Sequence, residues 1–371
     1  MDFNLPADTL MLRDMLRRFV QKEVRPLEME YFNTGELTPE IRARLRQLIE
    51  QMGLWGLTVP EQYGGGGLDT VATCVIEQEL GKTFIPIEIG ELPIVLYACS
   101  AEQQKNYLEP VLAGQRQAIL AVREPGIGDP HAWKTTAALD QGDYRLEGRK
   151  YLETQPNPGD YFIVYAKAPS DLNSTHFTAF LLEEGLAGLE ITRNQVVILN
   201  LNGCLAGAET VIGEPGRALA CGVQAAPRAW VRLAARYVGM VERLLEMSIE
   251  HAKDWISFGA AMAARPAIQR MIAEMQVNLE STRWLVYHAA WSMDEDPGAS
   301  STSLAAQVRL ASGEMLRRAV DQTTMIFAGP GPAPEIEPGR LVRSAIRLDQ
   351  LELTLQNARA AIAAELLNLE Q

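Results

Sequence analysis

The chain is poor in the residues that build metal centres and disulfide frameworks. Among its 371 residues there are only four cysteines and four histidines. The cysteines are widely spaced and form no CxxC pair, so the sequence offers neither a disulfide framework nor a zinc motif: Cys74, Cys99, Cys204 and Cys221. The histidines show no pairing at metal-ligand spacing. We therefore expect no metal site, and the low cysteine content favours a reducing compartment, the cytoplasm.

Positive charge and long apolar runs are scarce as well. Lys and Arg number 34 against 47 Asp and Glu, a net charge of −13, which argues against nucleic-acid or anionic-membrane partners recognised through bulk charge. No window approaches the roughly 18 uninterrupted apolar residues of a membrane span. Met1–Pro6 lacks the basic and apolar regions of an export signal. We expect no nucleic acid, no membrane span and no export.

What is present is a mainly helical pattern interrupted by one stretch of strands. Apolar residues recur at helical spacing from Ala7 to about residue 113, with a loop over 53–68. Between residues 118 and 212, short runs rich in Val, Ile, Tyr and Phe alternate with turns, which is typical of antiparallel strands. Long helical patterns return near residue 219. The sequence predicts helical residues 1–117, a small β domain over 118–215 and a helical bundle over 216–371.

One turn stands out as a candidate ligand cradle. Ala121–Pro130 is rich in Gly and Pro and opens the β region, before Lys134–Ala137 and Gly148–Lys150. A turn of this kind leaves its backbone N–H groups free of side-chain crowding, so it can approach a flat or phosphorylated ligand closely. We therefore predict a cofactor beside this turn.

Several spaced motifs along nearly the whole chain resemble the acyl-CoA dehydrogenase family. They are Gly53–Pro60 with Tyr63–Gly65, Glu79–Gly81, Glu124–Gly128, Gly213–Gly216 and Phe258–Gly259. The resemblance implies an α+β, mainly α, fold: an N-terminal helical domain, a central small antiparallel β domain and a C-terminal four-helix bundle.

The resemblance also implies an activity. In that family FAD lies between the β domain and the bundle, and a glutamate removes the α-proton of an acyl-CoA while the β-hydrogen leaves as hydride to the flavin. Electron-transfer flavoprotein accepts the electrons, and the adenine end of FAD is completed by a neighbouring subunit. We accordingly expect a role in fatty acid or lipid metabolism and a homo- or hetero-tetramer.

Glu352 is the candidate catalytic base. The segment Leu351–Thr354 falls where the family carries an aromatic-Glu-Gly-Thr sequence, but Leu353 replaces the glycine. Leu348, Leu351 and Leu355 have helical spacing, so a solvated glutamate on a continuous helix is the competing interpretation. Some family members place the base on the helix that opens the bundle. Here that stretch, Ala225–Arg232, contains no acid.

The resemblance assigns the cofactor contacts to nine positions: Val122, Arg123, Gly128, Asp129, Thr154, Phe258, Gly329, Thr354 and Gln356. Several depart from the family pattern. Arg123 replaces a threonine, and Asp129 replaces a serine and would place a carboxylate beside phosphate charges. Further departures are Leu152 for a tryptophan, Trp255 for an arginine and Met325 for a glutamine. Arg265 is a candidate replacement cation.

These departures leave alternatives open. The first is an FAD-dependent acyl-CoA dehydrogenase that uses Glu352. The second is a catalytically degenerate subunit that pairs with a homologous chain and supplies part of, or only scaffolds, a mixed FAD site. A third is a relative with different flavin chemistry, because a fold alone does not fix a reaction.

Overall fold

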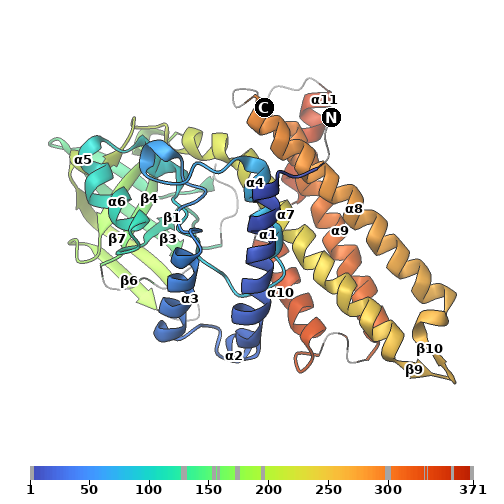
Figure 1. The fold of residues 1–371 in the computed structure, drawn as a ribbon. Helices are drawn as coiled ribbons and strands as arrows, with labels where there is room; N and C mark the ends of the chain where they lie inside the picture. The colour runs from blue at the N-terminus through green and yellow to red at the C-terminus, as the bar shows by residue number, and fades with distance from the viewer. Residues whose placement is uncertain are drawn as a thin grey trace. The chain divides into compact units, whose positions relative to one another are not determined.

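The computed structural model describes residues 4–126, 132–152, 156, 159–171, 176–193, 197–296, 302–329, 331, 333–351 and 355–367. The chain is divided into two compact units (Figure 1). The helical unit comprises residues 1–53, 68–88 and 226–371, and the β unit comprises residues 54–67 and 89–225. In the part of the chain with described structure, no helix combines the length and apolarity needed to cross a membrane. The boundaries of the three expected domains stay a prediction.

The N-terminal part of the helical unit is interrupted at a proline and at a glycine. Helix α1 (Ala7–Phe19) continues through a π turn, η1 (Val20–Val24), and a 3₁₀ turn, η2 (Arg25–Leu27), into α2 (Glu28–Thr34). Pro26 lacks an N–H group, so it sits where the regular α-helical ladder is interrupted. Gly35 ends α2 with φ +80°, a conformation that favours glycine. Helix α3 (Pro39–Gln51) follows.

Helix α4 (Thr70–Leu80) is capped by Asp69, whose side chain accepts a hydrogen bond from the Ala72 N–H at 2.6 Å. It lies against helix α7 at glycines. A Cβ atom on Gly239 would lie 1.8 Å from the Gln78 carbonyl oxygen, and one on Gly81 would lie 2.1 Å from the Arg236 carbonyl oxygen. The two backbones can approach this closely only because both positions lack a side chain.

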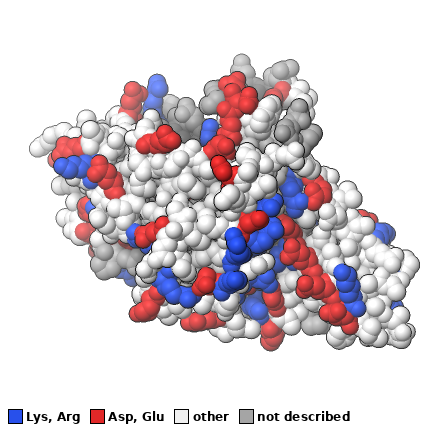
Figure 2. All heavy atoms as spheres, viewed as in Figure 1, with Lys and Arg blue, Asp and Glu red and all other residues white. Residues whose placement is uncertain are grey.

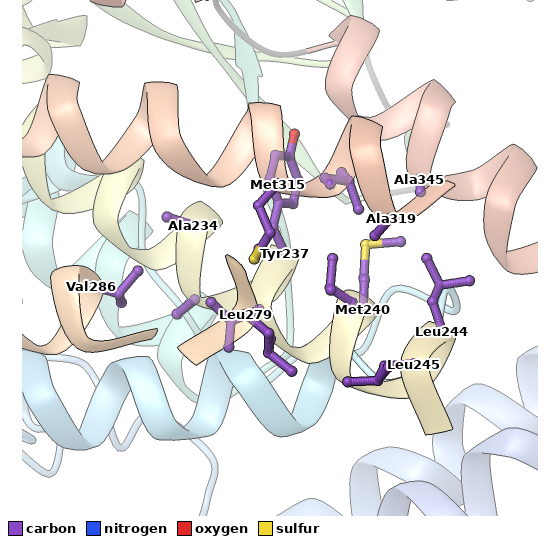
Figure 3. Close-up of a cluster of buried hydrophobic side chains, with 14 of the residues drawn as sticks. Ala234, Tyr237, Met240, Leu244, Leu245, Leu279, Val286, Met315, Ala319 and Ala345 are labelled. Carbon is purple, nitrogen blue, oxygen red and sulfur yellow. The ribbon is translucent and has the colours of Figure 1, made fainter. Parts of the chain in front are cut away.

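The long C-terminal helices run side by side in the helical unit (Figure 1). They are α7 (Ala218–Asp254), α8 (Pro266–Glu295), α9 (Thr302–Phe327), α10 (Glu337–Leu351) and α11 (Leu355–Leu366), with a hairpin of β9 (Ile256–Ser257) and β10 (Ala260–Ala261) between α7 and α8. The long helical patterns predicted from about residue 219 onward are therefore confirmed. In the core, Met240 and Leu244 of α7 approach residues of α8, α9 and α10, including Leu279, Met315 and Ala345 (Figure 3).

Buried ion pairs cross the helical unit. Arg243 on α7 is 1% exposed and donates to both carboxylate oxygens of Glu28, at 2.7 and 2.6 Å. It also donates to the Lys82 carbonyl oxygen and pairs with Glu337, which Arg25 contacts at 2.6 Å. Glu28 is 3% exposed. A charge removed from water to this extent is tolerated only when it is paired, so Arg243 ties α2, α7 and α10 together.

The β unit contains a sheet ordered β6-β7-β3-β2-β4-β5-β8, with β1 paired to β4. The strands are β1 (Ala118–Ala121), β2 (Thr136–Asp140), β3 (Asp143–Leu152), β4 (Tyr161–Lys167), β5 (Phe177–Glu183), β6 (Leu189–Arg193), β7 (Val197–Ala206) and β8 (Val211–Ile212). Short helical turns precede it: η3 (Glu61–Tyr63), η4 (Ile94–Ala98), α5 (Ala101–Gln103), η5 (Gln104–Leu108) and α6 (Glu109–Leu112).

The fold class expected from the sequence, mainly helical with a small central sheet, is confirmed. The pairing differs in one detail, because the sheet is mixed. Strand β1 runs parallel to β4, with Ala118 opposite Tyr161, whereas β3, β7, β5 and β6 pair antiparallel. A parallel pair needs a long connection, and residues 122–160, which contain the β2–β3 hairpin, supply it.

Replacing Arg243 with methionine tests the buried network. The variant keeps much of the volume but leaves the Glu28 carboxylate buried without its cation, and we expect a loss of about 3–5 kcal/mol in unfolding free energy. Arg46→Met removes an exposed pair with Glu50 and is the control, with an expected loss of at most about 1 kcal/mol. Urea unfolding followed by circular dichroism measures both. Equal losses would show that the network contributes no more than a surface pair.

Candidate cofactor and active site

The predicted ligand turn follows strand β1 directly. Val122 is half-buried, while Arg123 and Gly126 are exposed. Gly126 has φ +73°, and a Cβ atom built on it would have no neighbour within 4 Å. The described part of the turn therefore has an exposed arginine, Arg123, and an uncrowded backbone at Gly126. Both features suit an anionic or flat ligand.

The acid of this turn is directed inward. Glu124 is 8% exposed, and its two oxygens accept hydrogen bonds from the backbone N–H groups of Lys134 at 2.8 Å and Thr135 at 2.7 Å. Burial by itself raises the pKa of Glu124, but hydrogen bonds from Thr135 and Lys134 and the Lys150 charge outweigh it, so the pKa lies below its usual value. The carboxylate is thus ionised, buried and neutralised.

Lys150 supplies the neutralising charge from strand β3. Its side chain is fully buried, and Nζ donates to the Val122 carbonyl oxygen at 2.9 Å and to Glu124 at 3.2 Å. The ammonium also lies 5.0 Å from the centre of the Trp133 ring. Burial lowers the pKa of Lys150 to about 8, although the Glu124 carboxylate opposes that shift. The Tyr151 N–H donates to the Arg123 carbonyl oxygen at 2.9 Å, so β3 holds the turn by backbone and side chain.

Sequence reasoning singled out Glu124 and Lys150 as motif residues but missed their ion pair. A signal was present, because side chains alternate between the two faces of a strand. Lys150 falls on the same face as Leu146 and Leu152, both buried. A lysine on an apolar face needs a buried partner.

Leu152, which replaces the expected aromatic residue, is 1% exposed and belongs to the apolar core of the β unit.

The hairpin between α7 and α8 displays Phe258. The side chain is 98% exposed, and its φ of +49° is unusual for a residue other than glycine. Arg265 lies with its guanidinium 5.3 Å from the Phe258 ring centre and donates to the carbonyl and hydroxyl oxygens of Ser257, at 2.7 and 2.9 Å. The candidate replacement cation is therefore engaged within the hairpin. Trp255 beside it is 55% exposed.

Gly329 lies after α9 and is also open. A Cβ atom built there would have no neighbour within 4 Å, and Ala328 before it adopts φ +56°. Met325, one turn earlier, is 66% exposed. Val122, Arg123, Phe258 and Gly329 are thus the predicted contacts that the structure describes.

The remaining predicted site residues cannot be placed. Gly128, Asp129, Thr154, Thr354 and the candidate base Glu352 lie outside the described residues, and so does the side chain of Gln356, whose backbone belongs to α11. Their roles stay predictions.

Comparison with known proteins agrees with this fold. Residues 6–115 match the model "Acyl-CoA dehydrogenase, N-terminal domain", and residues 228–367 match "Acyl-CoA dehydrogenase, C-terminal domain". (R)-benzylsuccinyl-CoA dehydrogenase of Thauera aromatica is 31% identical over 368 residues, covering 91% of this chain and 89% of the relative. The caffeyl-CoA reductase-Etf complex subunit CarC of Acetobacterium woodii is 26% identical, covering 96% of this chain and 97% of the relative.

The FAD complex of PigA has a TM-score of 0.88 and 25% sequence identity, with 100% of each chain covered. These matches place the chain among the flavoprotein dehydrogenases. The chain belongs to the acyl-CoA dehydrogenase family. FAD is the cofactor of this family, and the described residues fit it: Arg123 is exposed at the turn, while the nearby Glu124 carboxylate is buried and neutralised.

Gly148 allows β3 to approach the segment that Glu124 anchors. It has φ +149°, and a Cβ atom there would lie 2.5 Å from Thr135 Oγ1 and 2.8 Å from Thr135 Cα. We expect Gly148→Ala to lower stability by about 2–4 kcal/mol, because it adds a clash to the backbone strain. The control is Gly142→Ala, which has φ +102° but no neighbour within 4 Å and should cost about 1 kcal/mol. Thermal unfolding compares them, and similar losses would contradict the close-approach argument.

Proposed function

We propose that this chain catalyses the FAD-dependent α,β-dehydrogenation of an acyl-CoA thioester. The observation that carries the proposal is the nearly full-length similarity to enzymes named as CoA-thioester dehydrogenases and reductases. Bound FAD supplies the acceptor for the hydride. Glu352 removes the α-proton, which requires a carboxylate with a pKa near neutrality and a water-poor site.

The proposed FAD contacts come from both parts of the sequence. Val122, Arg123, Gly128, Asp129 and Thr154 belong to the β unit, and Phe258, Gly329, Thr354 and Gln356 belong to the helical unit. Arg123, which is exposed at the turn, supplies positive charge for the FAD phosphates in this proposal. The backbone is open at Gly126 in the β unit and at Gly329 in the helical unit, so each position by itself allows a ligand to approach without meeting a side chain.

The proposed partners follow from the same relatives and from the surface. Electron-transfer flavoprotein is the proposed electron acceptor, since CarC is named as a subunit of an Etf complex. A homo- or hetero-tetramer is supported by the hairpin after α7, where the neighbouring apolar side chains of Trp255, Ile256 and Phe258 are 55%, 63% and 98% exposed and together offer a surface for a partner. On the face shown in Figure 2, acidic and basic side chains are interspersed, and this supports the proposal that the chain binds no nucleic acid. A place in the cytoplasm and in lipid metabolism completes the proposal.

A second candidate, a degenerate subunit that shares a mixed site with a homologous chain, is favoured by two exposed apolar side chains. Trp255 and Met325 are 55% and 66% exposed at positions where the family carries an arginine and a glutamine. Apolar groups there weaken the electrostatic hold on a dinucleotide phosphate and increase the apolar surface that a different chain can cover.

The flavin content of the purified chain separates the two candidates. A catalytically complete enzyme should be yellow, with close to one FAD per chain and a flavin spectrum bleached by its acyl-CoA substrate. The mixed-site candidate predicts a colourless chain that takes up FAD only after co-expression with a homologous partner. The first result supports the proposal and the second replaces it.

Replacing Glu352 with glutamine tests the base assignment. We expect the rate of flavin reduction to fall by about 10²–10⁴-fold while FAD stays bound, because only the proton acceptor is lost. Glu365→Gln, an exposed glutamate on α11, is the matched control and should react at the wild-type rate. Stopped-flow reduction by acyl-CoA measures both. Wild-type reduction by Glu352→Gln would rule the residue out as the base.

A further inference from the structure

Lys150 is a charge that is buried at a cost in free energy. Its side chain is fully buried, and burial lowers its pKa to about 8. A lysine whose pKa falls on folding costs free energy at neutral pH relative to an apolar residue of similar size. The two oxygens that its ammonium reaches, the Val122 carbonyl and the Glu124 carboxylate, both belong to the turn assigned to the cofactor.

We propose that Lys150 is a positioning residue for FAD: by holding Val122 and Glu124 together from inside the β unit, its ammonium sets the path of the cofactor turn. The inference rests on the proposed function, and it concerns a residue that does not touch the cofactor itself.

The geometry gives this ion pair control of both flanks of the turn. Val122 and Glu124 lie on its N-terminal side, and Glu124 in turn accepts hydrogen bonds from the N–H groups of Lys134 and Thr135 on its C-terminal side. One ammonium therefore fixes residues that bracket Gly126 and the predicted contacts Gly128 and Asp129. Without the Lys150 charge, the Glu124 carboxylate is buried without its cation. We therefore expect the carboxylate to move toward water and to displace the backbone of the turn.

The ion pair between Lys150 and Glu124 also depends on pH. Among the described residues, Glu124 faces it from the turn and Lys167 acts on it from β4, the first raising and the second lowering its pKa. Deprotonation near pH 8 removes the ion pair. The ordinary pKa of a lysine, which applies in the unfolded chain, is 10.5. Between pH values of about 8 and 10.5 the unfolded state therefore binds more protons than the folded state at this residue. The free energy of unfolding consequently rises with pH in that range. FAD affinity and fold stability should therefore move in opposite directions.

The experiment compares Lys150→Met with Lys167→Met. Lys167 is an equally buried lysine of the same sheet, and its ammonium lies 4.9 Å from the Phe177 ring centre. Each variant is examined in two ways: FAD binding to the deflavinated full-length protein, and hydrogen exchange of the amides of residues 117–135 and 146–152. We expect Lys150→Met to weaken FAD binding about tenfold or more and to speed exchange at Lys134, Thr135 and Tyr151, because it removes charge-assisted hydrogen bonds. Lys167→Met should do neither.

A titration of the wild-type protein supplies a test that needs no variant to fold. FAD affinity should fall as pH rises through about 8, while the unfolding temperature of the deflavinated protein should not fall with it. Unchanged exchange in a folded Lys150→Met would overturn the proposal, and so would a flat affinity from pH 7 to 9. Faster exchange with unchanged FAD affinity would refute the link to the cofactor and leave the proposed function standing. A wild-type chain that binds no FAD would refute the proposed function, with exchange still deciding whether Lys150 orders the turn.

Discussion

The helical unit depends on the burial of helix α4 on all sides. Its consecutive residues Glu77, Gln78 and Glu79 are only 4%, 7% and 0% exposed, so each polar group must find its partner inside the protein. Glu77 pairs with Arg232 and Arg236 of α7 at 2.6 and 2.7 Å, and Glu79 pairs with Arg17 of α1 at 2.8 Å. Gln78 donates to Glu242 and accepts from Tyr287 of α8. One short helix thereby fixes three others.

The close packing of α4 against α7 explains why glycines and ion pairs occur together at their interface. Gly239 and Gly81 bring the backbones of α4 and α7 into contact, which leaves no room for water between them. Ionised groups at such an interface are stable only with charged partners, and burial alone would raise the pKa of Glu77. Because Arg236 and Arg232 outweigh burial, the pKa of Glu77 is lowered instead. In the β unit, the buried carboxylate of Glu124 is likewise paired with a buried cation, Lys150.

The sequence predicts those helices and strands whose apolar residues recur at regular spacing, and the ends that glycine or proline marks. Helices α8 and α9, the end of α2 at Gly35 and the strands β4 and β5 follow from local patterns. Strand β6, Leu189–Arg193, is harder to predict from composition, because Glu190, Thr192 and Arg193 are polar, and its place at the sheet edge makes that composition acceptable. The ion pairs of α4 could not be predicted either, since Glu77–Glu79 looks like a solvated face until α1, α7 and α8 are packed around it.

In the candidate site, the residues that support the turn differ in kind from the residues expected to contact the cofactor. The family motifs around Glu124, Gly148 and Lys150 correspond to contacts inside the β unit, so they report how the turn is supported. Three of the departures from the family pattern, Arg123, Trp255 and Met325, are exposed, whereas Leu152 is buried in the core of the β unit. Exposed positions can change without disturbing the core, because their energies are set by whatever covers them. Preserved contacts of Glu124 and Lys150, together with changes at exposed positions, are what a change of partner or substrate would produce, whereas loss of the cofactor would remove the reason to keep the Lys150 charge buried.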